Sequence, residues 1–247
     1  MISLQNITKI YNGKTVLHGV SLEVPKAKTV SLIGPSGCGK STLLRIAMGL
    51  IQQDGGTVSI DGTIMRKENM LQTRRKMGYV IQKGGLFPHL TARQNCTLVT
   101  NFLNWDANRI EERIEELASL AKIEVSQLDR KPNELSGGQQ QRISLIRALM
   151  LDPEIVVLDE PLGSIDPLVR YELQTDLKAI FSKLNKTVLL VTHDLGEAAF
   201  LGDEIILMKD GNIEQKGSII QILKEPANAF VERFVNAQRS PLSELEL

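Results

Sequence analysis

A short, mostly apolar segment that runs directly into a glycine-rich loop constrains the fold of this chain more than any other feature. The segment is TVSLI at residues 29–33, the loop is GPSGCGKST at 34–42, and helical sequence, STLLRIAMGL, begins at residue 41. This strand–loop–helix order satisfies the pattern G-x-x-x-x-G-K-[ST] in the context that gives the pattern its meaning. The sequence therefore predicts a phosphate-binding loop in an α/β fold.

The residue types of this loop match the chemistry of a nucleoside triphosphate. Glycines let successive backbone N–H groups turn toward phosphate oxygens, and the helix start adds a positive end. Lys40 would contact the β- and γ-phosphates, and Ser41 would be a ligand of Mg²⁺. Cys38 is interpreted as a small residue in a tight turn rather than a redox group. The predicted nucleotide-binding residues are Gly34, Pro35, Ser36, Gly37, Cys38, Gly39, Lys40, Ser41 and Thr42.

Two adjacent carboxylates follow a second apolar segment, IVVLDEP. Ligands in open α/β sheets lie at the carboxyl ends of the strands, which is where Asp159 and Glu160 are expected. Asp159 suits the coordination shell of Mg²⁺, directly or through water. Glu160 is the candidate that polarises the attacking water.

Two further polar residues end predicted strands. His193 follows VLLVT and is predicted to hydrogen-bond the γ-phosphate and hold the attacking water in line. Gln82 ends MGYVIQ and is a candidate sensor of Mg²⁺ or γ-phosphate; a polar strand terminus is the simpler alternative. Tyr11, in KIYNGK, is a candidate for stacking on adenine, although its position alone leaves that role open.

A second glycine motif, ELSGGQQQR, starts at Glu134 and carries no lysine among its glycines. Ser136 and Gln139 match the capping box S-x-x-Q, so a helix is expected to begin here. The unpaired N–H groups of its first turn could complement a phosphate but could hardly hold a nucleotide alone. An ordinary capped helix start is the alternative. The residues that would face the phosphate are Ser136, Gly137, Gly138 and Gln139.

The remaining sequence predicts strands at both ends and helices in the middle. The first 65 or so residues alternate apolar with polar side chains, and EIILMKDGNIEQKG resembles a hairpin with its turn at Asp210-Gly211. In residues 107–123, Ile110, Ile114, Leu117 and Ala121 recur at helical spacing. No strand pattern is evident from about residue 91 to 130, which indicates an inserted helical subdomain.

Composition excludes several classes of protein. The 29 basic and 29 acidic side chains cancel, which argues against broad nucleic-acid binding. The opening MISLQNITKI lacks the apolar core of a signal peptide, and no apolar run approaches the roughly 18 residues that span a bilayer. Two cysteines, Cys38 and Cys96, give neither a metal-binding spacing nor a disulfide framework. A reducing cytosol is the expected compartment.

Taken together, these motifs resemble the ATP-binding subunits of ABC transporters over nearly the whole chain. The resemblance rests on GPSGCGKST, LSGGQQQR and IVVLDEP in this order. It implies that Tyr11 stacks on adenine, that Gln82 lies in the Q-loop, and that His193 is the switch histidine. It also implies a D-loop at residues 164–166, where Ser164 and Ile165 replace the commoner alanine and leucine.

The resemblance implies a fold as well as an activity. The expected fold is α/β of the P-loop NTPase type, a RecA-like core with a mainly parallel sheet, an N-terminal antiparallel β subdomain and an inserted helical subdomain. One domain would cover residues 1–240, with a short helix expected after Pro226 and a C-terminal tail at 231–247. Its core would be formed by 1–84 and 142–230, and the helical subdomain with the signature motif by 85–141.

The resemblance further implies an ATPase that uses ATP and Mg²⁺ and pairs head to tail with a second copy. In this family the signature motif of one copy closes over ATP bound to the other, which would explain two phosphate-facing loops in one chain. A membrane permease would bind the helical subdomain and the Q-loop, with Leu86, Phe87 and Leu90 as docking candidates; a hydrophobic staple within the subdomain is the alternative for these side chains. A solute-binding protein would take part indirectly, and no nucleic acid is expected. The chain would lie in the cytoplasm, peripheral to the inner face of the membrane.

Within the family, residues 80–95 and 166–211 look most like importers of osmoprotectants and quaternary amines such as glycine betaine and choline. The regulatory CBS domains of many such relatives are not expected here. Alternatives are the ATPase of a lipid- or lipoprotein-handling transporter, a DNA-repair-type ATPase and a translation ATPase. The DNA-repair class inserts coiled coils or zinc modules, and the translation class normally fuses two such domains.

Overall fold

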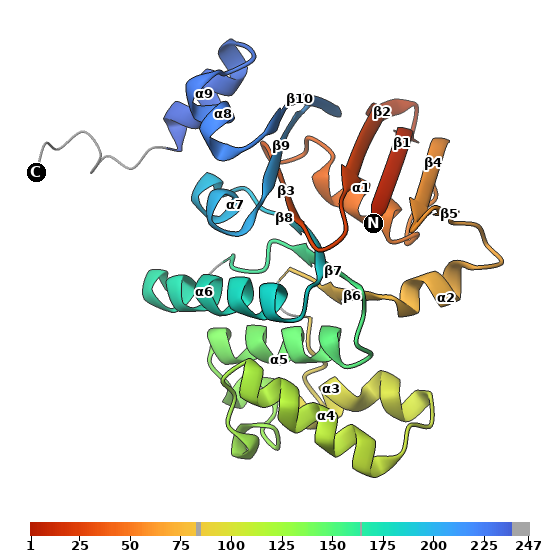
Figure 1. Cartoon of the computed structure of the whole chain (residues 1–247), viewed down its shortest axis with the longest axis vertical. Helices are drawn as coiled ribbons and strands as arrows, with labels where there is room; N and C mark the ends of the chain where they lie inside the picture. Colours follow the sequence, from red (N-terminus) through yellow and green to blue (C-terminus); the bar gives the residue numbers. More distant parts are fainter. Residues whose placement is uncertain (83–84, 164, 239–247) are drawn as a thin grey trace, which may run out of the picture. The chain divides into compact units, whose positions relative to one another are not determined.

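The computed structural model describes residues 1–82, 85–163 and 165–238 and consists of two compact units (Figure 1). The first unit comprises residues 1–65 together with the chain from 189 onward, and the second comprises residues 66–188. The subdomain boundaries predicted from the sequence at 85, 142 and 231 stay predictions. Lys83 and Gly84 in the Q-loop region, Ser164 of the D-loop and the tail beyond Gln238 lie outside the described residues.

The first unit begins with an antiparallel sheet, as the alternating sequence predicts. Its strands are ordered β2-β1-β4-β5. The bounds are β1 Ile2–Tyr11, β2 Lys14–Val24, β4 Gly55–Ile60 and β5 Thr63–Ile64. A two-residue turn joins β1 to β2, and its Asn12 and Gly13 both have positive φ, at 50° and 78°. This is the turn geometry that matches the twist of paired strands, and it places Tyr11 at the end of β1.

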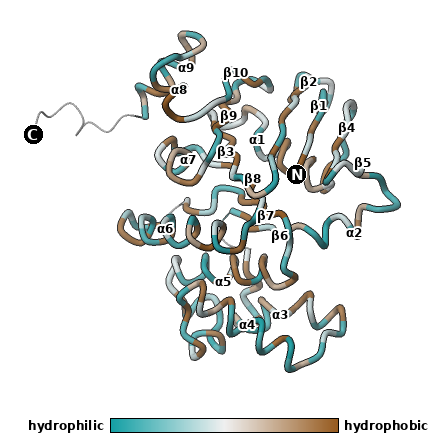
Figure 2. Tube along the Cα trace, viewed as in Figure 1, coloured by the Kyte–Doolittle hydropathy of each residue, from teal (hydrophilic) through white to brown (hydrophobic). Residues whose placement is uncertain are grey.

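A second sheet in this unit has the order β10-β9-β3-β8. The bounds are β3 Thr29–Ile33, β8 Thr187–Val191, whose first two residues belong to the second unit, β9 Glu204–Lys209 and β10 Asn212–Gly217. β3 runs parallel to β9, and every residue of β3 is buried. The predicted hairpin is confirmed, since β9 pairs antiparallel with β10 across Asp210 and Gly211. Figure 2 shows the hydrophobic residues of β3 and β9 in brown.

Four helices belong to the first unit: α1 Lys40–Ala47, α7 Leu195–Leu201, α8 Ile219–Lys224 and α9 Ala229–Ala237. Val231 and Val235 of α9 are buried in one cluster with Leu195 and Ala198 of α7 and with Ile33 of β3. The short helix expected after Pro226 is therefore present as α9, and its buried valines contribute to the core. Burial of two valines on one helical face stabilises this position by a few kcal/mol at most.

The second unit pairs β6 (Met77–Val80) in parallel with β7 (Ile155–Asp159). Its helices are α2 Met70–Arg75, α3 Ala92–Phe102, α4 Ala107–Leu120, α5 Gly137–Leu149 and α6 Pro167–Lys183. Two short 3₁₀ segments, Val125–Gln127 and Pro132–Glu134, lie between α4 and α5. The apolar face predicted in residues 107–123 is confirmed: Ile110, Ile114, Leu117 and Ala121 are all buried.

The predicted fold class is confirmed in its main features. β3, β7 and β8 are buried along their whole length, as expected of strands that helices cover on both faces. Each leads into a polar loop, and these loops carry the predicted phosphate-binding residues, the carboxylate pair and His193. Among the described residues, no helix combines the length and the apolar composition needed to cross a membrane.

Candidate functional site

The glycine loop joins the end of β3 to the start of α1 and requires glycine at specific positions. Gly34, Gly37 and Gly39 have φ values of 147°, 79° and 106°, which side-chain-bearing residues rarely adopt. A Cβ at Gly34 would collide with the carbonyl oxygen of Met208, and one at Gly39 would lie 2.8 Å from Leu17 Cδ2. The chain can therefore pass this close to β2 and β9 only with glycine.

Lys40 is buried and held at the centre of this loop. Its ammonium donates to the carbonyl oxygens of Gly34 at 2.7 Å and Pro35 at 2.9 Å. Only 6% of the residue is exposed, so its charge is concentrated among the backbone dipoles at the start of α1. A buried cation beside the first turn of a helix favours an anion, in keeping with the predicted phosphate role.

Cys38 contributes shape rather than thiol chemistry. Its side chain is 4% exposed, and its carbonyl oxygen accepts a hydrogen bond from the backbone N–H of Gly211 at 3.1 Å. Burial raises the pKa of the thiol, although Lys40 nearby opposes the shift. A protonated, enclosed thiol is a weak nucleophile, which supports the interpretation of Cys38 as a small turn residue.

Two other predicted residues of the first unit are exposed. Tyr11 is 41% exposed, and Lys9 Nζ lies 5.2 Å from the centroid of its ring. His193 follows β8, and a buried network fixes the chain around it. In this network Thr192 Oγ1 donates to Glu197 Oε2 at 2.6 Å, and Asp194 Oδ1 accepts from the backbone N–H of Glu197 at 2.9 Å. The imidazole is thus presented from a rigid turn at the start of α7.

The second unit brings three predicted residues together at the ends of β6 and β7. Asp159 is buried at 6% exposure, with the hydroxyl of Tyr79 3.5 Å from its Oδ2. Glu160 has a positive φ of 46°, a strained conformation that is more frequent at functional sites. Gln82 Nε2 donates to Glu160 Oε2 at 2.8 Å. This amide therefore holds the carboxylate that the sequence assigns to the attacking water.

The predicted metal ligands Ser41, Gln82 and Asp159 suit magnesium better than a metal that is bound by protein side chains alone. Among the described residues, no three His, Cys, Asp or Glu side chains form a group that could hold a metal ion. Mg²⁺ typically takes one or two protein oxygens and completes its octahedron with phosphate and water. The hydroxyl of Ser41, the amide oxygen of Gln82 and the carboxylate of Asp159 are oxygen donors of this kind.

The second glycine motif begins α5 with the predicted capping box. Ser136 Oγ accepts from the backbone N–H of Gln139 at 3.3 Å, and Gln139 Oε1 accepts from the N–H of Ser136 at 2.9 Å. Gln140 Nε2 donates to the carbonyl oxygens of Pro132 and Leu135, which fixes the approach to the helix. A Cβ at Gly137 would meet nothing within 4 Å, whereas one at Gly138 would lie 2.7 Å from Val169 Cγ1.

Comparison with known proteins assigns the family. The profile of the ABC transporter family matches residues 17–163, which include the glycine loop, the capped start of α5 and both carboxylates. The chain belongs to the ABC transporter family. A dimeric ATP-binding cassette, solved in a post-hydrolysis state with ADP and Pi, superposes with a TM-score of 0.80 at 35% sequence identity. That match covers 89% of this chain and 99% of the cassette. The predicted P-loop NTPase fold is thereby confirmed.

Two bacterial relatives have similar identity but different transport descriptions. The glycine betaine/carnitine/choline transport ATP-binding protein OpuCA of Bacillus subtilis is 43% identical over 240 residues, or 97% of this chain. The sulfate/thiosulfate import ATP-binding protein CysA of Neisseria meningitidis is 42% identical over 239 residues, or 95% of this chain. The chain spans 63% of the length of OpuCA and 66% of that of CysA.

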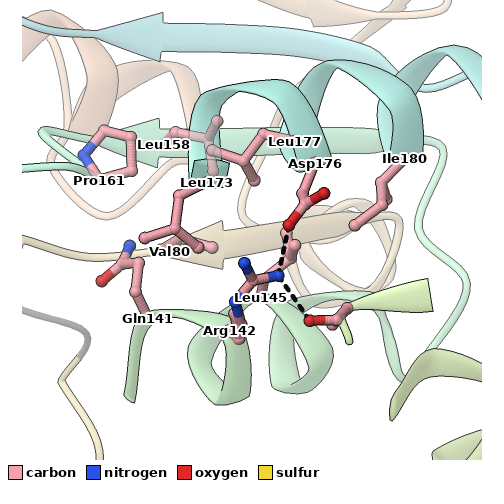
Figure 3. Close-up of a pocket in the computed structure, with 11 residues that line it drawn as sticks. Val80, Gln141, Arg142, Leu145, Leu158, Pro161, Leu173, Asp176, Leu177 and Ile180 are labelled. Carbon is pink, nitrogen blue, oxygen red and sulfur yellow. Dashed lines mark hydrogen bonds and ion pairs between the residues drawn. The ribbon is translucent and has the colours of Figure 1, made fainter. Parts of the chain in front are cut away.

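Helix α5, which begins with the second glycine motif, is anchored by charged residues that the motifs did not single out. Arg142 Nη1 lies 2.6 Å from Asp176 Oδ2 of α6 and donates to the carbonyl oxygen of Ala121 at 2.7 Å (Figure 3). Lys122 Nζ lies 2.7 Å from the other oxygen of Asp176. Burial would raise the pKa of Asp176, but hydrogen bonds and charges from Lys122 and Arg142 lower it. The ion pair between Arg142 and Asp176 fixes the orientation of α5 relative to α6.

The cavity beside the Arg142–Asp176 ion pair is a packing gap. Figure 3 shows Leu145, Leu173 and Ile180 around it, and its volume is about 10 Å³. That space admits at most about one water molecule. This gap is therefore too small to hold a nucleotide. Of the predicted D-loop, Asp166 caps α6 by accepting from the backbone N–H of Leu168 at 3.0 Å.

Proposed function

We propose that this chain is an ATPase subunit that powers an ABC importer. The observation that carries this proposal is the pair of unlike helix starts in one ABC chain. One surrounds a buried lysine with glycines of positive φ, and the other is capped by its own side chains. The second can complete a phosphate site but lacks the lysine that would let it hold a nucleotide alone. A second copy of the chain supplies what each site lacks.

The residues divide the work of hydrolysis by their chemistry. The loop from Gly34 to Thr42 binds the phosphates through backbone N–H groups and Lys40. Ser41, Gln82 and Asp159 supply oxygen donors for Mg²⁺, which would neutralise charge on the phosphates. Glu160, held by Gln82, accepts the proton of the attacking water. His193 orients that water against the γ-phosphate, and Tyr11 stacks on the adenine.

Head-to-tail pairing follows from the same division. In a two-fold dimer each copy presents its Ser136–Gln139 segment to the nucleotide bound by the other, so the same patches are used twice. ATP bridges the two copies, and loss of the γ-phosphate releases them. The solved cassettes similar to this chain are dimeric, which supports this arrangement.

The partner in transport is a membrane permease that binds the helical part of the second unit. Phe87 is 43% exposed, and Asn95 holds its backbone by accepting from the N–H at 2.8 Å and donating to the carbonyl at 3.1 Å. Leu98 and Phe102 of α3 are also exposed, one turn apart on the same helix. Apolar side chains on a fixed loop and helix suit a protein partner. The chain would then lie peripherally on the cytoplasmic face of the membrane, and a solute-binding protein would deliver the cargo.

The proposed cargo is an osmoprotectant or another quaternary amine. Support comes from the OpuCA relative, whose description names glycine betaine, carnitine and choline. The CysA relative, which is described as a sulfate/thiosulfate import protein, has nearly the same identity, so an inorganic anion is a second candidate cargo. A lipid- or lipoprotein-handling transporter is the third alternative.

Reconstitution separates these cargoes. The chain would be purified with its permease in lipid vesicles, with the solute-binding protein added, and ATP hydrolysis measured with glycine betaine or with sulfate. Stimulation by glycine betaine and not by sulfate supports the proposed cargo. The reverse pattern assigns the chain to an anion importer but keeps the ATPase role. If no ATP is hydrolysed, or if Glu160→Gln leaves the rate of hydrolysis unchanged, the enzymatic proposal itself is refuted.

A further inference from the structure

Helix α9 is followed by Gln238, whose side chain hydrogen-bonds the turn that carries His193. Gln238 Nε2 donates to the carbonyl oxygen of His193 at 3.0 Å, and Gln238 Oε1 accepts from the backbone N–H of Leu195 at 3.2 Å. One amide thus binds the backbone on both sides of Asp194. The N–H of Leu195 belongs to the first turn of α7, where a helix has no internal acceptor to offer.

The position of Gln238 is fixed by the rest of its helix. Val231 and Val235 pack against Leu195 and Ala198, so α9 rests on the same helix that Gln238 caps. At its other end, Asn228 accepts from the backbone N–H of Val231 at 3.1 Å and donates to Glu214 Oε2 at 2.7 Å. Because α9 is held at its start and along one face, the position of Gln238, which follows its last residue, is well defined.

We infer that Gln238 is a positioning residue for His193, so that the C-terminal helix controls the rate of ATP hydrolysis. This inference rests on the role proposed for His193 above. The exposed imidazole projects from a turn whose inner side is fixed by Thr192, Asp194 and Glu197. Gln238 adds the restraint on the backbone of His193 itself. Without it the turn keeps its fold, but the imidazole samples a wider range of positions relative to its target.

The test replaces Gln238 in the full chain. Gln238→Met has a similar length but can neither donate to His193 nor accept well from Leu195. Gln238→Glu keeps the acceptor and turns a carboxylate oxygen toward the His193 carbonyl. Both variants should lower kcat roughly three- to tenfold, the range expected for the loss of one or two hydrogen bonds, with KM for ATP unchanged. Asn236→Ala removes an exposed amide from the same helix and is the matched control.

Two further measurements separate positioning from general stability. Hydrogen exchange at the Leu195 amide should become faster in Gln238→Met, while the amides of Val231 and Val235 keep their protection. In a His193→Ala background, which alone should lower kcat at least tenfold, Gln238→Met should cause no further loss, because it acts through the missing imidazole.

Each alternative outcome overturns a different statement. An equal loss of kcat in both backgrounds would show a general structural effect and overturn the inference. Full activity of Gln238→Met beside an impaired His193→Ala would overturn the inference but leave the proposed role of His193 intact. Full activity of His193→Ala would overturn the role of His193 and, with it, the control by Gln238.

Discussion

Helices α1 and α5 both begin with glycines, yet their first turns are built in different ways. At α1 the glycines have positive φ, and the ammonium of the buried Lys40 places a positive charge within the loop. At α5 the capping box of Ser136 and Gln139 satisfies the backbone without lysine or left-handed glycine. Gly137 faces open space there. The first helix start thus has a buried cation beside it, whereas the second has no cation of its own.

The difference shows which property of a glycine motif carries a function. Glycines at 34 and 39 are required by the close approach of β9 and β2, so they would be needed in any protein with this loop. An added Cβ at Gly137 would meet none of the described residues within 4 Å, so the space beside it is open to a group from outside the chain. We therefore expect substitutions at α5 to affect assembly and substitutions near α1 to affect the nucleotide.

The largest expected effect comes from Glu160→Gln. Gln82 can still donate to the new amide oxygen, so the local structure should persist while the general base is lost. We expect kcat to fall roughly 100-fold or more, within the range for general-base catalysis. Glu154→Gln changes an exposed glutamate just before β7, which lies 3.8 Å from Lys76, and should leave kcat unchanged.

The same variant should reveal the dimer. With hydrolysis stopped, ATP stays intact and should convert the protein from monomer to dimer by linkage of ligand to assembly, whereas ADP should not. Light scattering after size exclusion measures both states. A protein that remains monomeric at saturating ATP would refute the head-to-tail proposal, and an unaltered kcat would remove Glu160 from the role of base.

Gly137→Asp, made in the Glu160→Gln background, tests the α5 side of the comparison. The position is open, and an acidic residue in the first turn favours a helix, so the fold should be retained. The carboxylate would nevertheless repel a phosphate of the partner's nucleotide. We expect the ATP-dependent dimer to weaken at least tenfold, while ATP still binds the monomer.

Gly137→Asn is the matched control, with the same shape and no charge. It should weaken the dimer less than Gly137→Asp does, because only the aspartate repels phosphate. Gly138 is a poorer test site, since any side chain there would press on Val169 within the same chain. If Gly137→Asp dimerises with ATP as well as its parent, the motif is only a capped helix start.

Much of both regions could be predicted from the sequence because local rules determine them. The glycine pattern, the S-x-x-Q box and the Asp-Gly turn each specify backbone geometry within a few residues. The apolar segments before residues 34, 159 and 192 likewise indicated buried strands. These predictions depend on neighbours in sequence, which a single chain displays directly.

The contacts that hold the site in place could not be predicted, because they join residues far apart in sequence. Gln82 reaches Glu160, Arg142 reaches Asp176, and Gln238 reaches His193. No spacing rule links such pairs, and each polar residue also suits a solvated surface.

Asp176→Asn should have an intermediate effect and sharpens the comparison, because α5 relies on a distant anchor where α1 relies on its own loop. Asp176 and Arg142 are largely buried, so loss of this charge pair should lower the free energy of unfolding by about 2 kcal/mol. Lys122 is 70% exposed, and Lys122→Gln, the matched control, should cost about 1 kcal/mol or less. Urea unfolding compares the two.

The pH dependence of that difference provides a second check. Lys122 and Arg142 lower the pKa of Asp176 in the folded chain against the opposing effect of burial. The stabilisation is therefore complete above the unfolded pKa of about 3.9 and is lost as pH falls through the folded value. The gap between wild type and Asp176→Asn should shrink on acidification. A gap that is constant across the acidic range would show that the carboxylate charge is not its source.

Tyr11→Ala should have the smallest effect and tests how far the nucleotide site extends beyond phosphate binding. An aromatic contact contributes about 1 kcal/mol, so removal of the ring should weaken ATP binding roughly fivefold. Tyr11→Phe keeps the ring and should keep the affinity. Because stacking ignores the hydrogen-bonding edge of the base, ATP and GTP should lose affinity alike in a calorimetric titration. A loss confined to ATP would mean that residue 11 reads the base edge, and unchanged affinity would leave the phosphate loop as the sole source of binding in this unit. Unchanged affinity would limit the contrast between α1 and α5 to phosphate chemistry, whereas a loss in Tyr11→Ala would add a base contact that α5, which has no aromatic residue, cannot offer.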